Sequence, residues 1–203
     1  MERWFTSYQG RWDLRTVRSH LNENFRREIA SLVTQLDLEP KVGSPKKGLV
    51  IYNKDERNEI VVRIKKFTFD KFALVRPGDS YYTPVFNFDI TVLAKKVGRV
   101  SRRVSGKDLV YDGPMIVTFP EDYPNEYPFF VLPKYRTFVG GAHSNHMYAG
   151  GKMCLFADFG RSTRAWDRTR DTSAVAFGVA MRWIVWHERD RERGVDADEI
   201  NLF

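Results

Sequence analysis

The chain has 203 residues, of which 42% are hydrophobic and 29% are charged. This length fits one domain with enough apolar side chains to bury a core, and the composition excludes a wholly disordered chain. A single cysteine, Cys154, excludes an intrachain disulfide framework and is typical of a reducing compartment. We therefore expect a cytoplasmic protein without a targeting segment or a membrane span. The net charge of +7 is dispersed and decides no function alone.

The first predicted element is a long amphipathic helix over residues 14–36. Apolar residues recur there at steps of three and four, with polar residues between them. Glu39-Pro40 and a Gly-Ser-Pro cluster end this helix. Strand patterns follow at residues 49–52 and 60–69, and in the second of these Lys66 can share a face with Ile60, Val62 and Ile64.

The clearest strand is predicted at residues 85–93, where the side chains of one face are Phe86, Phe88, Ile90 and Val92. Two further strands are predicted over residues 109–119 and 129–132. Because short turns join successive strands, we expect an antiparallel meander of about four strands.

The stretch from Lys134 to Thr172 is rich in glycine, polar and without a sustained period. A long irregular segment inside a compact domain is more often a functional loop than a spacer. Cys154 lies in it, and Gly150 and Gly151 are predicted to form a turn.

A closing helix is predicted over about residues 173–191, capped by Asp171, Thr172 or Ser173. Its apolar stripe consists of Phe177, Ala180, Met181 and Ile184. The sequence thus predicts one α+β domain over residues 1–203. Residues 1–82 hold the first helix and extra strand material, residues 83–193 the core with the cysteine-bearing loop, and residues 194–203 a tail.

The most specific string in the chain is FPEDYPNEYP, at residues 119–128. Its three prolines indicate a stiff, extended turn at the end of a strand, and a rigid connection is the simplest interpretation. The string also resembles the F-P-x-D-Y-P-x-x-P-P signature of ubiquitin-conjugating enzymes, with Tyr127 where the first of the last two prolines usually lies.

A second motif surrounds the cysteine, where the chain reads His143-Ser144-Asn145 and then GKMCL at residues 151–155. This order is similar to the family's H-P-N motif and its G-x-[IV]-C-L motif. Ser144 replaces the proline, and the interval from Asn145 to Cys154 is one residue longer than in the common eukaryotic pattern. Trp166 and Thr172 fit the tryptophan and threonine that follow the cysteine in this family.

The resemblance implies an α+β fold of the ubiquitin-conjugating type, with a single closing helix as in bacterial members. It implies a thioester on Cys154 with the C-terminus of a modifier or partner protein, which is then transferred. It further implies a place in bacterial antiphage operons of the CBASS type, with a cGAS-like nucleotidyltransferase or a ubiquitin-like modifier as partner.

The chemistry of the candidate residues can be stated from their side chains. A thiolate is both a good nucleophile and a good leaving group, so Cys154 could carry an acyl group. An amide donor such as Asn145 could stabilise the tetrahedral oxyanion. By family analogy His143 would brace the loop, and Asp158 could orient or deprotonate the incoming amine. We take Tyr123, Pro124 and Trp166 as candidate binding residues, although Trp166 is most simply a core or interface aromatic.

No nucleotide-binding glycine loop is recognisable, so we expect no cofactor and either a separate activating enzyme or a substrate that arrives activated. A zinc site at His143, His146 and Cys154 would lack a fourth ligand, and no protease signature surrounds the cysteine.

Taken alone, a cysteine between Met153 and Leu155 would be a small buried hydrophobe. The alternative function is therefore a catalytically silent protein-binding module of the same fold. Nucleic-acid binding would rest only on the net charge, and we do not favour it.

Overall fold

The computed structural model describes residues 49–52, 58–74, 82–96, 108–120, 123–139, 146–156 and 165–194. The predicted helix over residues 14–36 and the tail beyond Gly194 lie outside these ranges. So do three of the candidate catalytic residues, His143, Asn145 and Asp158.

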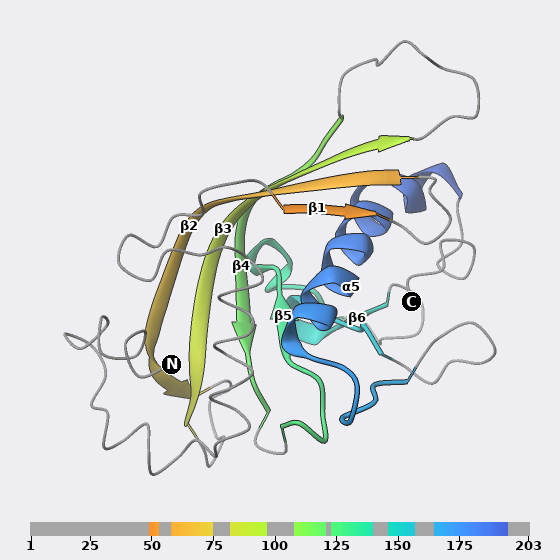
Figure 1. The fold of residues 1–203 in the computed structure, drawn as a ribbon. Helices are drawn as coiled ribbons and strands as arrows, with labels where there is room; N and C mark the ends of the chain where they lie inside the picture. The colour runs from red at the N-terminus through yellow and green to blue at the C-terminus, as the bar shows by residue number, and fades with distance from the viewer. Residues whose placement is uncertain are drawn as a thin grey trace.

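A seven-stranded antiparallel sheet forms the body of the described part (Figure 1). Along the sheet the strands follow the order β1-β2-β3-β4-β5-β7-β6, so the first five form a meander as predicted. Their bounds are β1 (Leu49–Tyr52), β2 (Asn58–Leu74), β3 (Tyr82–Lys96), β4 (Asp108–Thr118), β5 (Phe129–Val131), β6 (Met147–Tyr148) and β7 (Lys152–Met153).

The prediction of about four strands was too low. β1 and β2 extend the meander at one edge, and the hairpin of β6 and β7 adds two strands beyond β5. Each hairpin strand has only two residues, which is too short for an alternating pattern to be visible in the sequence. The segment predicted as one long loop therefore contains ordered strands.

The alternation predicted for β3 is confirmed. Phe86, Phe88, Ile90 and Val92 are each at most 1% exposed and share the face on which the core forms. In β2, Ile60, Val62 and Ile64 are buried on the same face. Because β-branched and aromatic side chains fit a half-buried pleated surface, the alternation of apolar residues in these strands predicts the buried face correctly.

Lys66 does not share the buried face of β2, contrary to the sequence prediction. The register between β2 and β3 shifts between Ile64 and Lys66, so one extra residue is inserted into β2. A bulge of this kind ends the strict period of two and leaves Lys66 exposed, and Phe67 then pairs with Phe88.

One helix, α5 (Ser173–Val185), packs across the inner face of β2, β3 and β4 (Figure 1). Thr172 caps it, since its hydroxyl accepts the backbone N–H of Val175 at 3.3 Å. The helical path continues through a π-helical turn (Trp186–Asp190) and a 3-10 turn (Arg191–Arg193). It ends at Gly194, whose φ of 75° is left-handed.

The closing helix is buried on more sides than the predicted stripe. The four stripe residues Phe177, Ala180, Met181 and Ile184 are fully buried, as expected. Ala176, Val179, Trp183 and Val185 are also at most 3% exposed. Phe177 contacts Phe88 and Phe130 with ring centroids 5.8 and 6.2 Å apart, so the helix is joined to the sheet by aromatic packing.

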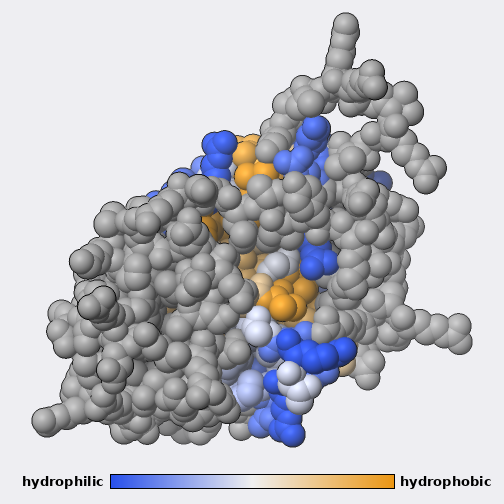
Figure 2. All heavy atoms as spheres, in the orientation of Figure 1, coloured by the Kyte–Doolittle hydropathy of each residue, from blue (hydrophilic) through white to orange (hydrophobic). Residues whose placement is uncertain are grey.

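On the side of α5 that faces the viewer in Figure 1, hydrophobic side chains reach the surface over the lower part of the helix (Figure 2). Hydrophilic side chains gather over the segment that leads into it (Figure 2). Arg168, Thr169 and Arg170 of that segment are exposed. Among the described residues, no helix has the length and hydropathy needed to cross a membrane.

Candidate active site around Cys154

Cys154 follows β7 directly, and its backbone is fixed from two sides. Its N–H donates to the carbonyl of His146 at 2.9 Å, and the same carbonyl accepts the indole N–H of Trp183 at 2.9 Å. Trp183 lies on α5 and is fully buried. His146, with a φ of 47°, turns the chain into β6. One carbonyl therefore ties the cysteine to both the hairpin and the helix.

The hairpin of β6 and β7 brings Tyr148 beside Cys154. Gly150 and Gly151 form its turn, as predicted, with φ values of 78° and 82°. A side chain at Gly151 would place its Cβ 2.6 Å from the carbonyl oxygen of Leu132, a contact that no residue other than glycine can avoid. The N–H of Leu132 in turn donates to the carbonyl of Gly151 at 3.0 Å. The hairpin is thus pinned against the segment that follows β5.

Two tyrosine hydroxyls connect to the thiol in a chain. The Cys154 thiol donates to the hydroxyl of Tyr148, with Sγ and Oη 3.6 Å apart. The hydroxyls of Tyr148 and Tyr127 are hydrogen-bonded to each other, and the Tyr127 hydroxyl also accepts the backbone N–H of Leu155. We call these three side chains the thiol cluster.

The thiol cluster is protonated at neutral pH. Cys154 is 3% exposed, and burial raises the pKa of its thiol above the usual 9.0. The hydrogen bond with Tyr148 and the charge of Lys152 lower that pKa in part. Burial also raises the pKa of Tyr148 to about 12 and raises the pKa of Tyr127. Lys152 Nζ lies 3.2 Å from the ring centroid of Phe129 and 5.2 Å from that of Tyr148.

The FPEDYPNEYP turn lies next to the same site. Phe119 is buried and packs edge-on against Tyr123, with ring centroids 5.0 Å apart. The N–H of Tyr123 donates to the carbonyl of Pro120 at 3.1 Å, and the Tyr123-Pro124 peptide is cis. Tyr127, near the end of this turn, thereby lies in the thiol cluster.

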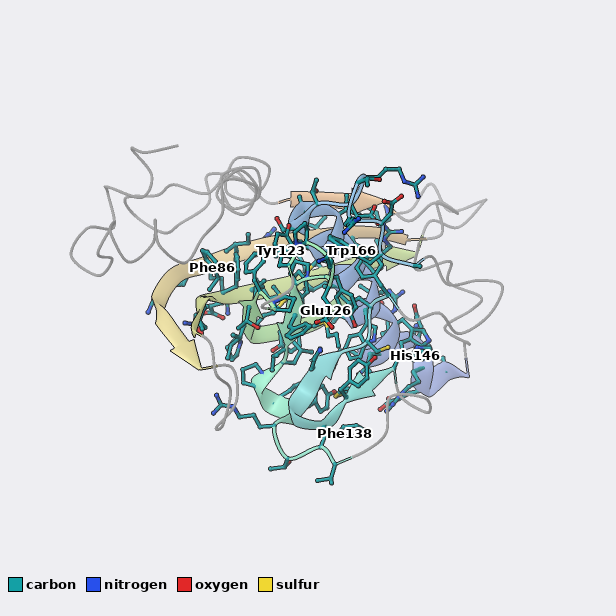
Figure 3. All side chains as sticks on the ribbon, turned by 90° about the horizontal axis from the view of Figure 1, so that it is seen from below. Phe86, Tyr123, Glu126, Phe138, His146 and Trp166 are labelled. Carbon is teal, nitrogen blue, oxygen red and sulfur yellow. The ribbon has the colours of Figure 1, made fainter. Side chains whose placement is uncertain are left out.

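Trp166, in the segment before α5, connects the proline-rich turn to the residues that follow Cys154. Its indole N–H donates to the carbonyl of Pro124 at 2.7 Å, and its ring packs on Phe156, two residues after the cysteine. Phe156 also contacts Tyr127, with ring centroids 5.1 Å apart. Figure 3 shows Tyr123, Glu126 and Trp166 near one another on this side of the sheet, with Phe138 at the far edge.

The structure thus brings together four of the seven candidate site residues. Cys154, Pro124 and Trp166 lie in one connected network, and Tyr123 joins it as a packing residue that is only 6% exposed. The indole of Trp166 is half-buried and hydrogen-bonded, in keeping with an aromatic that positions the turn. His143, Asn145 and Asp158 lie outside the described residues.

An open hollow of about 530 Å³ adjoins this network. It is lined by Asn125 and by residues 165–170. Within it, Arg168 donates to the side-chain oxygen of Asn125 at 2.6 Å, and Arg170 pairs with Asp167 at 2.6 Å. The hollow therefore presents polar groups to solvent beside Trp166.

A second buried polar group lies where α5 continues into the π-helical turn. Glu188 accepts from the hydroxyl of Tyr135 at 2.7 Å and pairs with Lys134 and with His187. We call Glu188 and these three partners the carboxylate cluster. Burial raises the pKa of Glu188, but the hydrogen bonds from His187, Lys134 and Tyr135 outweigh it, so that the pKa falls to about 2.

Tyr127, Tyr148 and Lys152 were not singled out from the sequence as functional residues. Two signals were available: Tyr127 replaces a proline of the signature, and the double glycine places Tyr148 opposite Lys152 in a hairpin. No group of three or more metal-ligating side chains occurs within the described ranges.

Comparison with known proteins returned no matching family model, no matching curated protein and no matching solved structure.

Proposed function

We propose that this chain is an acyl transferase that forms a thioester on Cys154, in the manner of ubiquitin-conjugating enzymes. One observation carries the proposal: two sequence motifs that are far apart in the chain meet around its single cysteine. Tyr127, from the first motif, is hydrogen-bonded to Leu155 of the second, and Trp166 joins Pro124 to the ring of Phe156.

The proposed reaction has two steps. In the first, Sγ of Cys154 attacks the carbonyl carbon of an acyl thioester; the Sγ–C bond forms, the donor's S–C bond breaks, and the thiol proton ends on the leaving thiolate. In the second, an amine attacks the new thioester. The N–C bond forms, the Sγ–C bond breaks, and an amine proton returns to Cys154. A separate activating enzyme supplies the first thioester.

The partner in this proposal follows from the family resemblance alone. It is the C-terminal carboxyl group of a ubiquitin-like modifier or of a cGAS-like nucleotidyltransferase, within bacterial antiphage defence. Co-purification of this chain with candidate partners, with and without reducing agent, identifies which carboxyl group is accepted.

Burial of the thiol favours a second function. Cys154 is only 3% exposed, and its raised pKa leaves it protonated at neutral pH. A catalytically silent binding module would keep such a cysteine as a packing residue.

The two functions are separated by giving the protein an activated acyl group directly. The purified chain is incubated with a short peptide ending in glycine, as its 2-mercaptoethanesulfonate thioester. The enzyme is expected to gain the peptide mass and lose it with a thiol reductant. Cys154→Ser is expected to give a reductant-resistant ester and Cys154→Ala no adduct.

An adduct that persists in Cys154→Ala contradicts the assigned nucleophile. A wild-type protein that gains no peptide between pH 7 and 10, while its thiol reacts with iodoacetamide, supports the binding module instead. Met153→Leu serves as the matched control, because it changes a buried neighbour of the cysteine without touching the thiol.

A further inference from the structure

We infer that Tyr148 is a further catalytic residue, whose hydroxyl donates a hydrogen bond to the oxyanion formed during acyl transfer at Cys154, and that Tyr127 positions it. This inference rests on the proposed function. The starting point is geometric: Tyr148 Oη lies 3.6 Å from Sγ, the atom that bonds to the reacting carbon. A donor within hydrogen-bonding reach of Sγ is also within reach of an oxygen on the carbon attached to Sγ.

The hydrogen of the Tyr148 hydroxyl can turn toward the substrate. A tyrosine hydroxyl is both a donor and an acceptor, and its hydrogen rotates to suit its neighbours. In the resting state the thiol donates to Tyr148. The Tyr148 oxygen also accepts from Tyr127. Once Sγ carries an acyl group it has no hydrogen to donate, and the Tyr148 hydrogen can turn toward the substrate oxygen.

Tyr127 is placed to donate to Tyr148 before and after acylation. Its own hydroxyl accepts the backbone N–H of Leu155, which leaves the Tyr127 hydrogen available for Tyr148. In the acylated state the donors then run in one direction, from Leu155 through Tyr127 and Tyr148 to the oxyanion. Hydrogen bonds in such a chain polarise and strengthen one another in a low-dielectric site.

Tyr148 keeps its proton throughout the reaction. Burial holds its pKa at about 12, so the hydroxyl remains a donor across the pH range in which a thioester survives. The bonds made and broken are those given above, and the thiol proton still ends on the leaving thiolate. The contribution of Tyr148 is a hydrogen bond that strengthens as charge develops on the oxygen.

The test compares two reactions of the same sulfur. Acylation by the glycyl peptide thioester passes through an oxyanion, whereas alkylation by iodoacetamide does not. Tyr148→Phe removes only the hydroxyl, and its acylation rate constant at saturating peptide is expected to fall about 10²-fold, the effect of losing one oxyanion donor. Its alkylation rate is expected to change less than about tenfold, the effect of losing the one hydrogen bond between the thiol and Tyr148.

Tyr127→Phe is expected to lower the acylation rate constant about fivefold, the effect of one neutral hydrogen bond, with the half-saturating peptide concentration unchanged. Tyr135→Phe is the matched control, since it removes a partly buried tyrosine hydroxyl from the carboxylate cluster, and no change in acylation is expected. Circular dichroism and thermal unfolding establish that each variant is folded. Should Tyr148→Phe not fold, Tyr127→Phe still decides the question.

Equal losses in acylation and alkylation would overturn the inference, because Tyr148 would then act on the thiol and not on the oxyanion. Unchanged acylation in Tyr148→Phe would overturn it while leaving the proposed function intact. A wild-type protein that is alkylated but never acylated overturns the proposed function, and this inference with it.

Discussion

Two polar groups of opposite character can be compared within the described part, the carboxylate cluster around Glu188 and the thiol cluster around Cys154. Glu188 is only 10% exposed, yet three partners hold its charge so well that its pKa falls to about 2. Cys154 is buried as deeply, but its only side-chain hydrogen-bond partner in the described part is the hydroxyl of Tyr148, and its pKa rises. Burial is similar in the two places, so the partners decide the sign of the shift.

Under the proposed function, the carboxylate is the structural group of the two and the thiol is the reactive one. A carboxylate whose acceptor positions are filled has no capacity left for a substrate, and it stabilises the joint between the helix and the segment after β5. A thiol that donates to one weak acceptor can give up that hydrogen bond and react.

The largest expected effect comes from breaking the hairpin that holds the thiol cluster. Gly151→Ala forces a Cβ against the carbonyl of Leu132 in a left-handed backbone, and we expect a loss of about 3 kcal/mol in the free energy of unfolding. Gly150→Ala has a similar φ but open space around it, so a loss of about 1 kcal/mol is expected. Urea unfolding of both variants measures the difference, and equal losses would mean that the close contact is not decisive.

The carboxylate cluster is tested next. Glu188→Gln removes the negative charge that accepts hydrogen bonds from Lys134 and Tyr135, and a loss of about 2 kcal/mol in the free energy of unfolding is expected. Glu192→Gln, an exposed residue one turn further, is the matched control and should change stability by less than about 0.5 kcal/mol.

The pH dependence of stability sharpens the assignment of Glu188. Because its folded pKa of about 2 lies below its usual 4.5, its contribution is present above pH 4.5 and is lost as the pH falls toward 2. As the pH falls over this range, the free energy of unfolding should decrease less in Glu188→Gln than in the wild type. An identical decline would assign the acid sensitivity to other carboxylates.

The smallest expected effect is in the reactivity of the thiol itself. Because burial raises the pKa of its thiol, Cys154 should react slowly with iodoacetamide at pH 7. The alkylation rate should increase with pH, and the pH at its half-maximum should lie above that of a free cysteine in a short peptide. The chain has one cysteine, so the mass increase reports this site alone. The folded state favours the neutral thiol, and stability should therefore fall as the pH passes through the raised pKa. A midpoint below that of the peptide would contradict the burial of the thiol.

Much of the fold could be predicted because the relevant patterns are local. The alternation of Phe86, Phe88, Ile90 and Val92 records which face of β3 is buried, and the spacing of Phe177, Ala180, Met181 and Ile184 does the same for α5. The exposure of Lys66, which the alternation placed on the buried face of β2, could not be predicted in this way, since a bulge depends on the register with the neighbouring strand.

By itself, the sequence determined the antiparallel meander, the closing helix and the choice of Cys154 as the residue to examine. Only the tertiary structure decided what surrounds the thiol. Tyr127 precedes Cys154 by a long stretch of chain, and Tyr148 lies across a hairpin whose strands have two residues each. The contact of Tyr148 with the sulfur, and that of Tyr127 with Tyr148, depend on a turn, a hairpin and a helix packed together. No periodic pattern records such non-local contacts, and they also set the pKa of the thiol, because burial and hydrogen-bond partners exist only once the chain has folded.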